Sequence, residues 1–181
     1  MIEINDRMIK FDREIYAVKS PYYITYDKFW DGGYQSDASL LEKSEFYHVA
    51  RLFSDFVKEY ISLLDESIII GSKFSQKEKI FEIWKDKNKY DSFNNLNEYI
   101  KKRKTYKIAL PKDDKIIDYI IENDFRYLSC IDLYLPKNKI VLQPTCHSEI
   151  FVYCKEYHNI LPDLKRAVNN TILSLKKYSV D

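Results

Sequence analysis

The last third of the chain holds three strand-like segments separated by short turns, and this pattern restricts the fold more than any other feature. The segments cover residues 125–136, 139–145 and 148–157. Within the first, Ile131, Leu133 and Leu135 fall on one face of an extended chain, with Asp132 and Tyr134 on the other, as the two-residue period of a strand requires. The pattern predicts an antiparallel β-meander that is covered on one side.

Helix-like periodicity precedes this region. From Asp37 to about Glu66, apolar side chains recur at three- and four-residue steps, which predicts a long amphipathic helix broken near Ser44. Shorter helices are predicted for residues 75 onward, 95–104, 113–123 and the chain after Pro162. The last of these carries an apolar flank of Leu164, Val168, Ile172, Leu173 and Leu175.

Further strands are predicted in residues 1–30, where Tyr, Ile and Val alternate, and in residues 106–111. With 181 residues, 45% of them hydrophobic, the chain is long enough to bury a core. We therefore predict a single α+β domain spanning residues 1–181. It would comprise N-terminal short strands, central helices, a C-terminal antiparallel β-meander and a closing helix.

The charge balance argues against a uniformly basic nucleic-acid binder. The chain has 29 Lys and Arg against 28 Asp and Glu, a formal net charge of +1. The distribution is uneven, because residues 1–66 carry 8 basic and 13 acidic side chains whereas residues 67–181 carry 21 and 15. We expect an electrostatic dipole with an acidic first third.

No sequence feature predicts export or membrane insertion. Glu3, Asp6 and Arg7 lie near the start, where a signal peptide has an apolar core. The longest aliphatic runs, such as Ile68–Ile70, fall far below the roughly 18 apolar residues of a membrane-spanning helix. Three cysteines in a chain of this size favour a reducing compartment. We expect a soluble cytoplasmic protein with no membrane partner.

Potential zinc ligands gather near the C-terminus, where Cys146, His147, Cys154 and His158 fall within a stretch of thirteen residues. Adjacent Cys146 and His147 point to opposite faces of an extended segment, and zinc sites commonly use two-residue gaps. We expect no metal site, and we expect Cys154 to pack as a small apolar residue near Val152.

No segment has the glycine loop or nucleophile turn of a common catalytic motif, and no cofactor is expected. His48 lies beside Phe46 and Val49 in the long helix, which favours a partly buried structural histidine over a general base. Asp132 and Glu149 are candidates to flank a cleft on neighbouring strands, although two carboxylates on a solvated sheet face are the commoner arrangement. The sequence favours a binding protein over an enzyme.

Two segments are candidate binding surfaces, and the first is the aromatic and acidic stretch YYITYDKFWDGGYQSD, residues 22–37. Tyr and Trp dominate binding hot spots, and neighbouring carboxylates pair with a basic partner. Alternate rings in such a strand can equally be core residues, above all Tyr23 and Phe29. The predicted partner-binding residues here and on the following helix are Asp27, Trp30, Asp31, Tyr34, Asp37, Glu42 and Glu45.

The second candidate surface is the basic segment 99–107, in which Tyr99 and Tyr106 flank a run of cations. Its rings would stack on bases while the cations bind phosphates. The same cations also suit the C-terminal end of a helix. The basic residues of this alternative surface are Lys101, Lys102, Arg103 and Lys104.

A tyrosine-rich α+β domain with the acidic aromatic segment YDKFWDGGYQSD resembles the bacterial immunity proteins that neutralise toxins of contact-dependent growth inhibition and related polymorphic systems. The resemblance covers the general plan of the whole chain. It implies an inhibitor that binds a cognate C-terminal toxin domain, often a nuclease, and occludes its active site or another essential surface. Because nucleases tend to be basic, an acidic patch would steer association. The alternative is a nucleic-acid-binding or nucleic-acid-processing protein that uses segment 99–107.

Replacing both Trp30 and Asp31 by Ala tests the acidic aromatic segment. If these side chains are hot spots, the double variant loses several kcal/mol of binding free energy. Isothermal titration calorimetry measures the affinity, and circular dichroism checks the fold. Unchanged affinity with an intact fold would remove this segment from the binding surface.

Overall fold

The computed structural model describes residues 22–26, 43–65, 67–70, 106–109, 115–125, 131–145 and 147–178. Within these ranges the chain forms seven strands and three helices, which confirms the predicted α+β class. The strands are β1 (Tyr22–Thr25), β2 (Ser67–Ile70), β3 (Tyr106–Ala109), β4 (Leu133–Leu135), β5 (Ile140–Thr145), β6 (Glu149–Cys154) and β7 (Ser174–Lys177). The helices are α2 (Lys43–Leu64), α5 (Lys115–Phe125) and α6 (Tyr157–Asn169).

The described strands join into one sheet in the order β3-β2-β4-β5-β6-β1-β7, and each described pair is antiparallel. The predicted meander is confirmed as β4-β5-β6, in which Leu142 pairs with Leu133 on one side and Val152 on the other. Its first strand is shorter than the predicted segment 125–136, because Phe125 ends α5 and β4 covers only Leu133–Leu135. The early strand β1 lies inside the sheet, because Ile24 pairs with both Ile150 and Leu175. The sheet therefore joins the two ends of the described chain.

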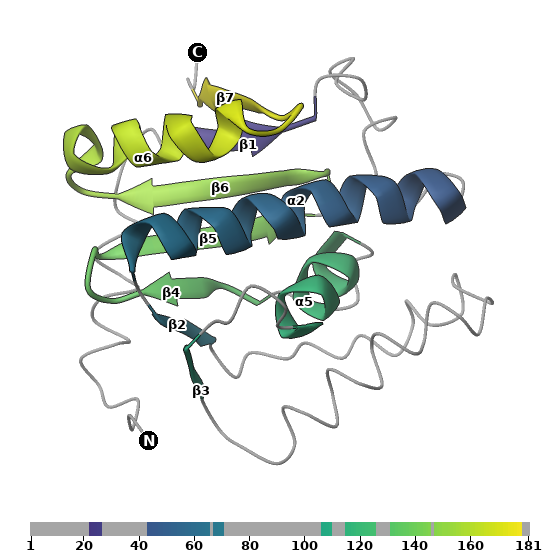
Figure 1. Ribbon diagram of the computed structural model, residues 1–181, viewed down its shortest axis with the longest axis horizontal. Coiled ribbons are helices and arrows are strands. Elements are labelled where there is room, and N and C mark those ends of the chain that lie inside the picture. Colours follow the sequence, from purple (N-terminus) through teal and green to yellow (C-terminus); the bar gives the residue numbers. More distant parts are fainter. Residues whose placement is uncertain are drawn as a thin grey trace.

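The hydrophobic core lies between the sheet and the helices. Figure 1 shows α2, α5 and α6 on the same face of the sheet, so the meander is covered on this side as predicted. The rings of Phe53 on α2 and Phe125 on α5 meet edge to face, with centroids 4.9 Å apart, a geometry that aromatic pairs favour. The helix α2 supplies a continuous buried stripe: Phe46, Val49, Ala50, Phe53, Phe56, Val57, Tyr60 and Ile61.

Two cations tie α2 to its neighbours. The ammonium group of Lys58 lies 2.5 Å from a carboxylate oxygen of Asp118 on α5. At the other end, the Lys137 Nζ in the β4–β5 turn donates to the backbone oxygen of Asp65, 3.2 Å away. Because α2 has no basic residue in its own last turn, Lys137 places a cation at the negative end of the helix from a distant part of the sequence.

The closing helix differs from the prediction at both ends. It was expected to begin after Pro162 and to continue beyond Leu175, whereas α6 contains Pro162 in its second turn and is followed by β7. The helix ends because Thr171 donates to the Val168 oxygen through its backbone N–H at 2.8 Å and its hydroxyl at 2.7 Å. Leu175 then pairs with Ile24 of β1. Because of this pairing, Leu175 belongs to a strand and not to the predicted helix.

Some of the remaining predicted helices and strands are confirmed, and others lie outside the described residues. The long helix, the strand at 106–111 and the helix at 113–123 correspond to α2, β3 and α5. The predicted break near Ser44 does not occur within α2, which is continuous from Lys43 to Leu64. The strand β2 was not predicted, because its three isoleucines form a short apolar run with no alternation. The strands predicted before residue 22 and the helices predicted at 75 onward and 95–104 lie outside the described residues.

The partly buried Tyr157 connects α6 to the sheet. The strand β1 begins opposite Val152, so Cys154 extends beyond it. The Tyr157 hydroxyl accepts from the Cys154 N–H at 3.2 Å and donates to the Val152 oxygen at 2.9 Å. The ring of Tyr157 also packs on Tyr22, with centroids 5.0 Å apart. Burial raises the pKa of Tyr157 to about 12, so the hydroxyl remains a donor at neutral pH.

Replacing Tyr157 by Phe tests this contact. The variant keeps the ring but leaves a buried N–H and a buried carbonyl without the hydroxyl, which costs about 1–3 kcal/mol of unfolding free energy. Urea denaturation measures the loss. The control is Tyr178→Phe, because Tyr178 is exposed and its change is expected to be close to neutral. Equal stability of the two variants would contradict the assigned role of Tyr157.

Candidate functional site

The face of the sheet opposite the helices carries aromatic and polar side chains. Strand residues alternate between faces, and Ile24, Leu142, Ile150, Val152 and Cys154 belong to the helix-side core. Their neighbours therefore lie on the opposite face, which we call the outer face. These neighbours include Tyr23 and Thr25 on β1, Val141, Gln143 and Thr145 on β5, Glu149, Phe151 and Tyr153 on β6, and Lys176 on β7.

Four rings form a continuous aromatic row across the outer face, comprising Tyr153, Phe151, Tyr23 and Tyr178. Phe151 lies 6.2 Å from Tyr153, 5.7 Å from Tyr23 and 5.6 Å from Tyr178 between ring centroids. Tyr23 and Tyr178 approach edge to face at 6.4 Å. Tyr178 is 43% exposed and the other three rings are partly buried. The aromatic row is thus held rigidly by β6 and β1 and is accessible at one end.

A chain of hydrogen bonds, here called the polar cluster, borders the aromatic row. The Tyr153 hydroxyl donates to Gln143 Oε1 at 3.1 Å, and Gln143 Nε2 donates to Asp132 Oδ1 at 3.1 Å. The Tyr134 hydroxyl lies 3.5 Å from Asp132 Oδ2. Burial, and then the charge of Asp132 and the nearby Tyr178, raise the pKa of Tyr153. Tyr153 therefore stays protonated at neutral pH and fixes the orientation of the Gln143 amide.

A buried carboxyl group lies at the other border of the outer face. Glu149 pairs in register with Thr25 on β1 and Thr145 on β5. Glu149 is 5% exposed and Thr25 is 2% exposed. Burial raises the pKa of Glu149 to about 7, against the opposing effect of Lys176. We call Glu149, Thr25, Thr145 and Ser148 the glutamate corner.

The structure locates one of the predicted partner-binding residues. Glu45 is exposed in the first turn of α2, as a contact residue must be. The remaining predicted residues lie outside the described residues, and they stay predictions. These are Asp27, Trp30, Asp31, Tyr34, Asp37 and Glu42 in the acidic segment, and Lys101, Lys102, Arg103 and Lys104 in the basic segment.

The rings of β1 divide between the two faces. Tyr22 packs on Tyr157 on the helix side, and Tyr26 is buried in the core. Tyr23 was considered as a core residue, but it lies on the outer face in the aromatic row. The aromatic row itself was not predicted, since it joins residues more than 120 positions apart. The alternation of Phe151 and Tyr153 in β6 was the local signal available.

The ligand-type residues do not form a common site among the described side chains. His147 lies exposed in the turn before β6, Cys154 is buried at the far end of that strand, and His158 is exposed on α6. Burial raises the pKa of the Cys154 thiol, and its place in the core agrees with the prediction of an apolar role. The described residues contain no group of three or more His, Cys, Asp or Glu side chains suited to a metal. Cys146 lies outside them.

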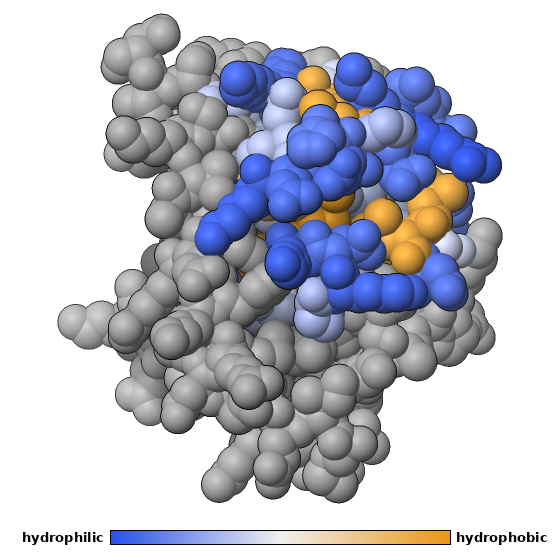
Figure 2. All heavy atoms as spheres, turned by 90° about the vertical axis from the view of Figure 1, so that its left-hand side faces the viewer, coloured by the Kyte–Doolittle hydropathy of each residue, from blue (hydrophilic) through white to orange (hydrophobic). Residues whose placement is uncertain are grey.

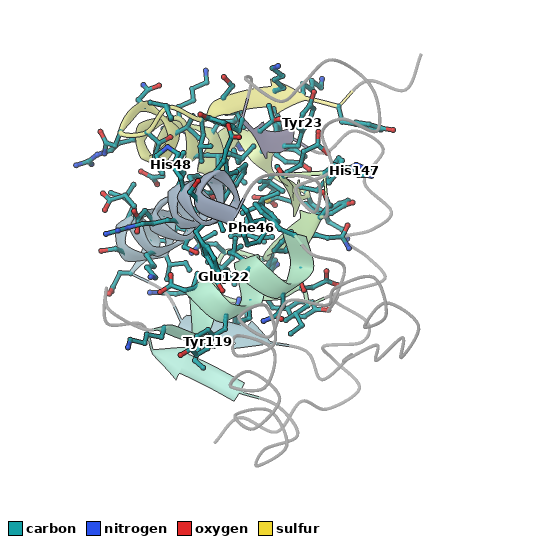
Figure 3. The ribbon with its side chains drawn as sticks, turned by 90° about the vertical axis from the view of Figure 1, so that its right-hand side faces the viewer. Tyr23, Phe46, His48, Tyr119, Glu122 and His147 are labelled. Atoms are coloured by element: carbon teal, nitrogen blue, oxygen red, sulfur yellow. The ribbon has the colours of Figure 1, made fainter. Side chains whose placement is uncertain are left out.

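Two expectations about catalytic candidates were wrong. His48 is exposed on α2 and not partly buried. Figure 3 shows it on the helix layer, apart from Tyr23 and His147 on the sheet side. Asp132 and Glu149 do not lie on neighbouring strands, because β5 separates β4 from β6. The error over His48 arose because residues at adjacent helix positions point about 100° apart, so buried neighbours do not imply a buried histidine.

The helix side presents a different surface. The outward positions of α2 include Glu45, His48 and the pair Arg51 and Asp55, whose charged atoms are 3.9 Å apart. Figure 2 views the end where α2 finishes and α6 begins, and the described atoms there are mainly hydrophilic with small hydrophobic areas. These outward positions of α2 therefore present charged and polar groups.

Comparison of the chain with protein-family models, curated proteins and solved structures found no match. In the part of the chain that the structure describes, no helix has the length and apolar character needed to cross a membrane.

Replacing Gln143 by Glu tests the polar cluster. At pH 7 the new carboxylate cannot donate to Asp132 and repels it, so we expect the variant to lose about 1–3 kcal/mol of unfolding free energy. The loss decreases near pH 4.5, because a protonated carboxyl group again donates a hydrogen bond. Urea denaturation at both pH values measures this. A pH-independent loss would contradict the contact with Asp132.

Proposed function

We propose that the protein is an immunity-type inhibitor that binds a cognate bacterial toxin domain through the aromatic row and the adjoining acidic segment, residues 27–45. The observation that carries the proposal is the row of four rings on the sheet face opposite the helices. The identification of the partner as a toxin, and as a nuclease in particular, rests on the resemblance in plan to immunity proteins.

The aromatic row has the properties of a protein-binding surface. Its rings combine apolar faces with three tyrosine hydroxyl groups, and Tyr178 is the exposed ring of the row. Tyr23, Phe151 and Tyr153 come from paired strands, so little side-chain entropy remains to be lost on binding. The polar cluster at one end supplies the hydrogen-bonding rim that surrounds the centre of many interfaces. A partner with a complementary apolar centre would bury this row.

The acidic segment continues directly from the same strand. Tyr23 belongs to the aromatic row, β1 ends at Thr25, and the predicted contact residues begin at Asp27. The segment leads into α2, where Glu45 is exposed. The carboxylates of this segment would steer a basic toxin domain, and the rings of the aromatic row would then hold it by packing. Occlusion of the toxin requires no catalytic group in the inhibitor.

One observation favours nucleic acid as a second candidate partner. Lys176 pairs in register with Tyr23, so a cation lies beside the rings. Single-stranded nucleic acids bind such surfaces through base stacking and phosphate contacts. This second function predicts binding that weakens steeply with salt, whereas packing of a protein on aromatic rings does not.

A growth-protection assay tests the proposed function. The C-terminal domain encoded immediately upstream of this gene is expressed in a bacterial host with and without the protein. We expect the domain alone to stop growth, and the protein to bind it and restore growth. A harmless upstream domain, or a toxic one that the protein does not bind, would refute the proposal. Salt-sensitive binding of single-stranded RNA, with no protection, would favour the second candidate.

A matched pair of surface variants tests the aromatic row. Tyr178→Ala removes its most exposed ring, and Ile172→Ala removes an apolar side chain that is 57% exposed outside the row. We expect the first to weaken toxin-domain binding by about tenfold or more and the second to leave it unchanged. Calorimetry measures both affinities. Equal affinities would exclude the exposed end of the aromatic row from the interface.

A further inference from the structure

The glutamate corner contains a buried carboxyl group that the proposed interface does not use. Within the described residues, Glu149 is one of only two carboxylates that are less than 9% exposed. The other, Asp124, accepts a hydrogen bond from the Ile131 N–H at 3.0 Å. No hydrogen bond to the Glu149 side chain is found from the described residues. Burial without such a donor disfavours the charged form of a carboxyl group.

The surroundings of Glu149 are polar but poorly paired. The Thr145 and Ser148 hydroxyl oxygens are buried and have no hydrogen-bond partner among the described residues. Ser148 has a φ of 55°, a left-handed conformation that is unfavourable for a residue other than glycine. The pairing of β1, β5 and β6 therefore keeps Ser148, in the turn between β5 and β6, in a backbone conformation of unfavourable free energy.

Few charges face this corner from the packed elements. Neighbouring β5 and β1 contribute the hydroxyl groups of Thr145 and Thr25, and β1 adds the phenol group of Tyr23, two positions away on the same face. On β7, one strand further, Lys176 is the cation that acts on Glu149. His147 is exposed in the adjoining turn. Among the described residues, Lys176 is the one cation whose charge favours the ionised form of Glu149.

We propose that Glu149 is a pH-sensitive switch: when it loses its proton, the corner of the sheet formed by β1, β5, β6 and the turn at Ser148 loosens. An ionised carboxylate at this buried position is poorly solvated, and it gains contact with water when the corner opens. The switch does not depend on the toxin partner proposed above, because it concerns the free protein.

The direction of the effect follows from proton binding. In the closed corner the pKa of Glu149 is about 7, against an ordinary value of 4.5 when solvated. Below pH 4.5 both states hold the proton, so pH has no effect. Between these values the open state releases the proton while the closed state keeps it, so the closed state becomes less favoured as pH rises. Above about pH 7 both states are ionised and the loss is complete.

Two NMR measurements test the switch in the full chain. The ¹³C shift of the Glu149 carboxyl group reports its titration, and amide hydrogen exchange of residues 148–150, corrected for intrinsic rates, reports opening of the corner. We expect a midpoint near pH 7 and an opening equilibrium that rises about tenfold or more between pH 5 and pH 8. Glu149→Gln, which cannot ionise, should change less than about twofold.

Two further variants keep the test decisive. Glu156→Gln removes an exposed carboxylate and should retain the wild-type pH profile of opening. Lys176→Gln removes the favourable cation and should move the Glu149 midpoint upward, which provides an independent test if Glu149→Gln fails to fold. A Glu149 midpoint near 4.5, or the same pH profile in Glu149→Gln as in the wild type, would overturn the proposal.

Discussion

Packing of α2 against one face of the sheet is the contact on which the rest of the structure depends. The helix is 22 residues long, and its apolar stripe meets α5 through Phe53 and Phe125. Removal of these side chains from water favours the fold, at roughly 25 cal/mol for each Å² of apolar surface. Lys58 and Lys137 then add polar contacts from α2 to α5 and to the β4–β5 turn.

The helices pack on one face of the sheet, and the other face carries most of the polar strand side chains described above. The aromatic row, the polar cluster and the glutamate corner all lie there, and all are positioned by antiparallel register. β1 is central to this arrangement, because Tyr23 joins the aromatic row while Thr25 borders Glu149. Binding by the rings and pH sensing by the corner would therefore act on the same strand.

The order of the strands also explains why β7 ends the described sheet. It pairs with β1 on one side, and Lys176 and Lys177 occupy the strand. Lysines on an edge strand oppose the addition of another strand, since their charges would be placed against an incoming chain. The same Lys176 affects the ionisation of Glu149, which links the edge of the sheet to the glutamate corner.

The sequence by itself determined the α+β class, the meander, the stripe of α2 and the burial of Cys154, because each depends on the local period of apolar residues. It also predicted Glu45 as a partner-binding residue, and the exposure that such a role requires is present. Only the tertiary structure decided that Leu175 lies in a strand, that His48 is exposed, and that Tyr23 joins Phe151. These outcomes depend on pairing between strands far apart in the chain, or on which side of a helix meets the sheet. Local periodicity specifies a face, but long-range packing decides what that face contacts.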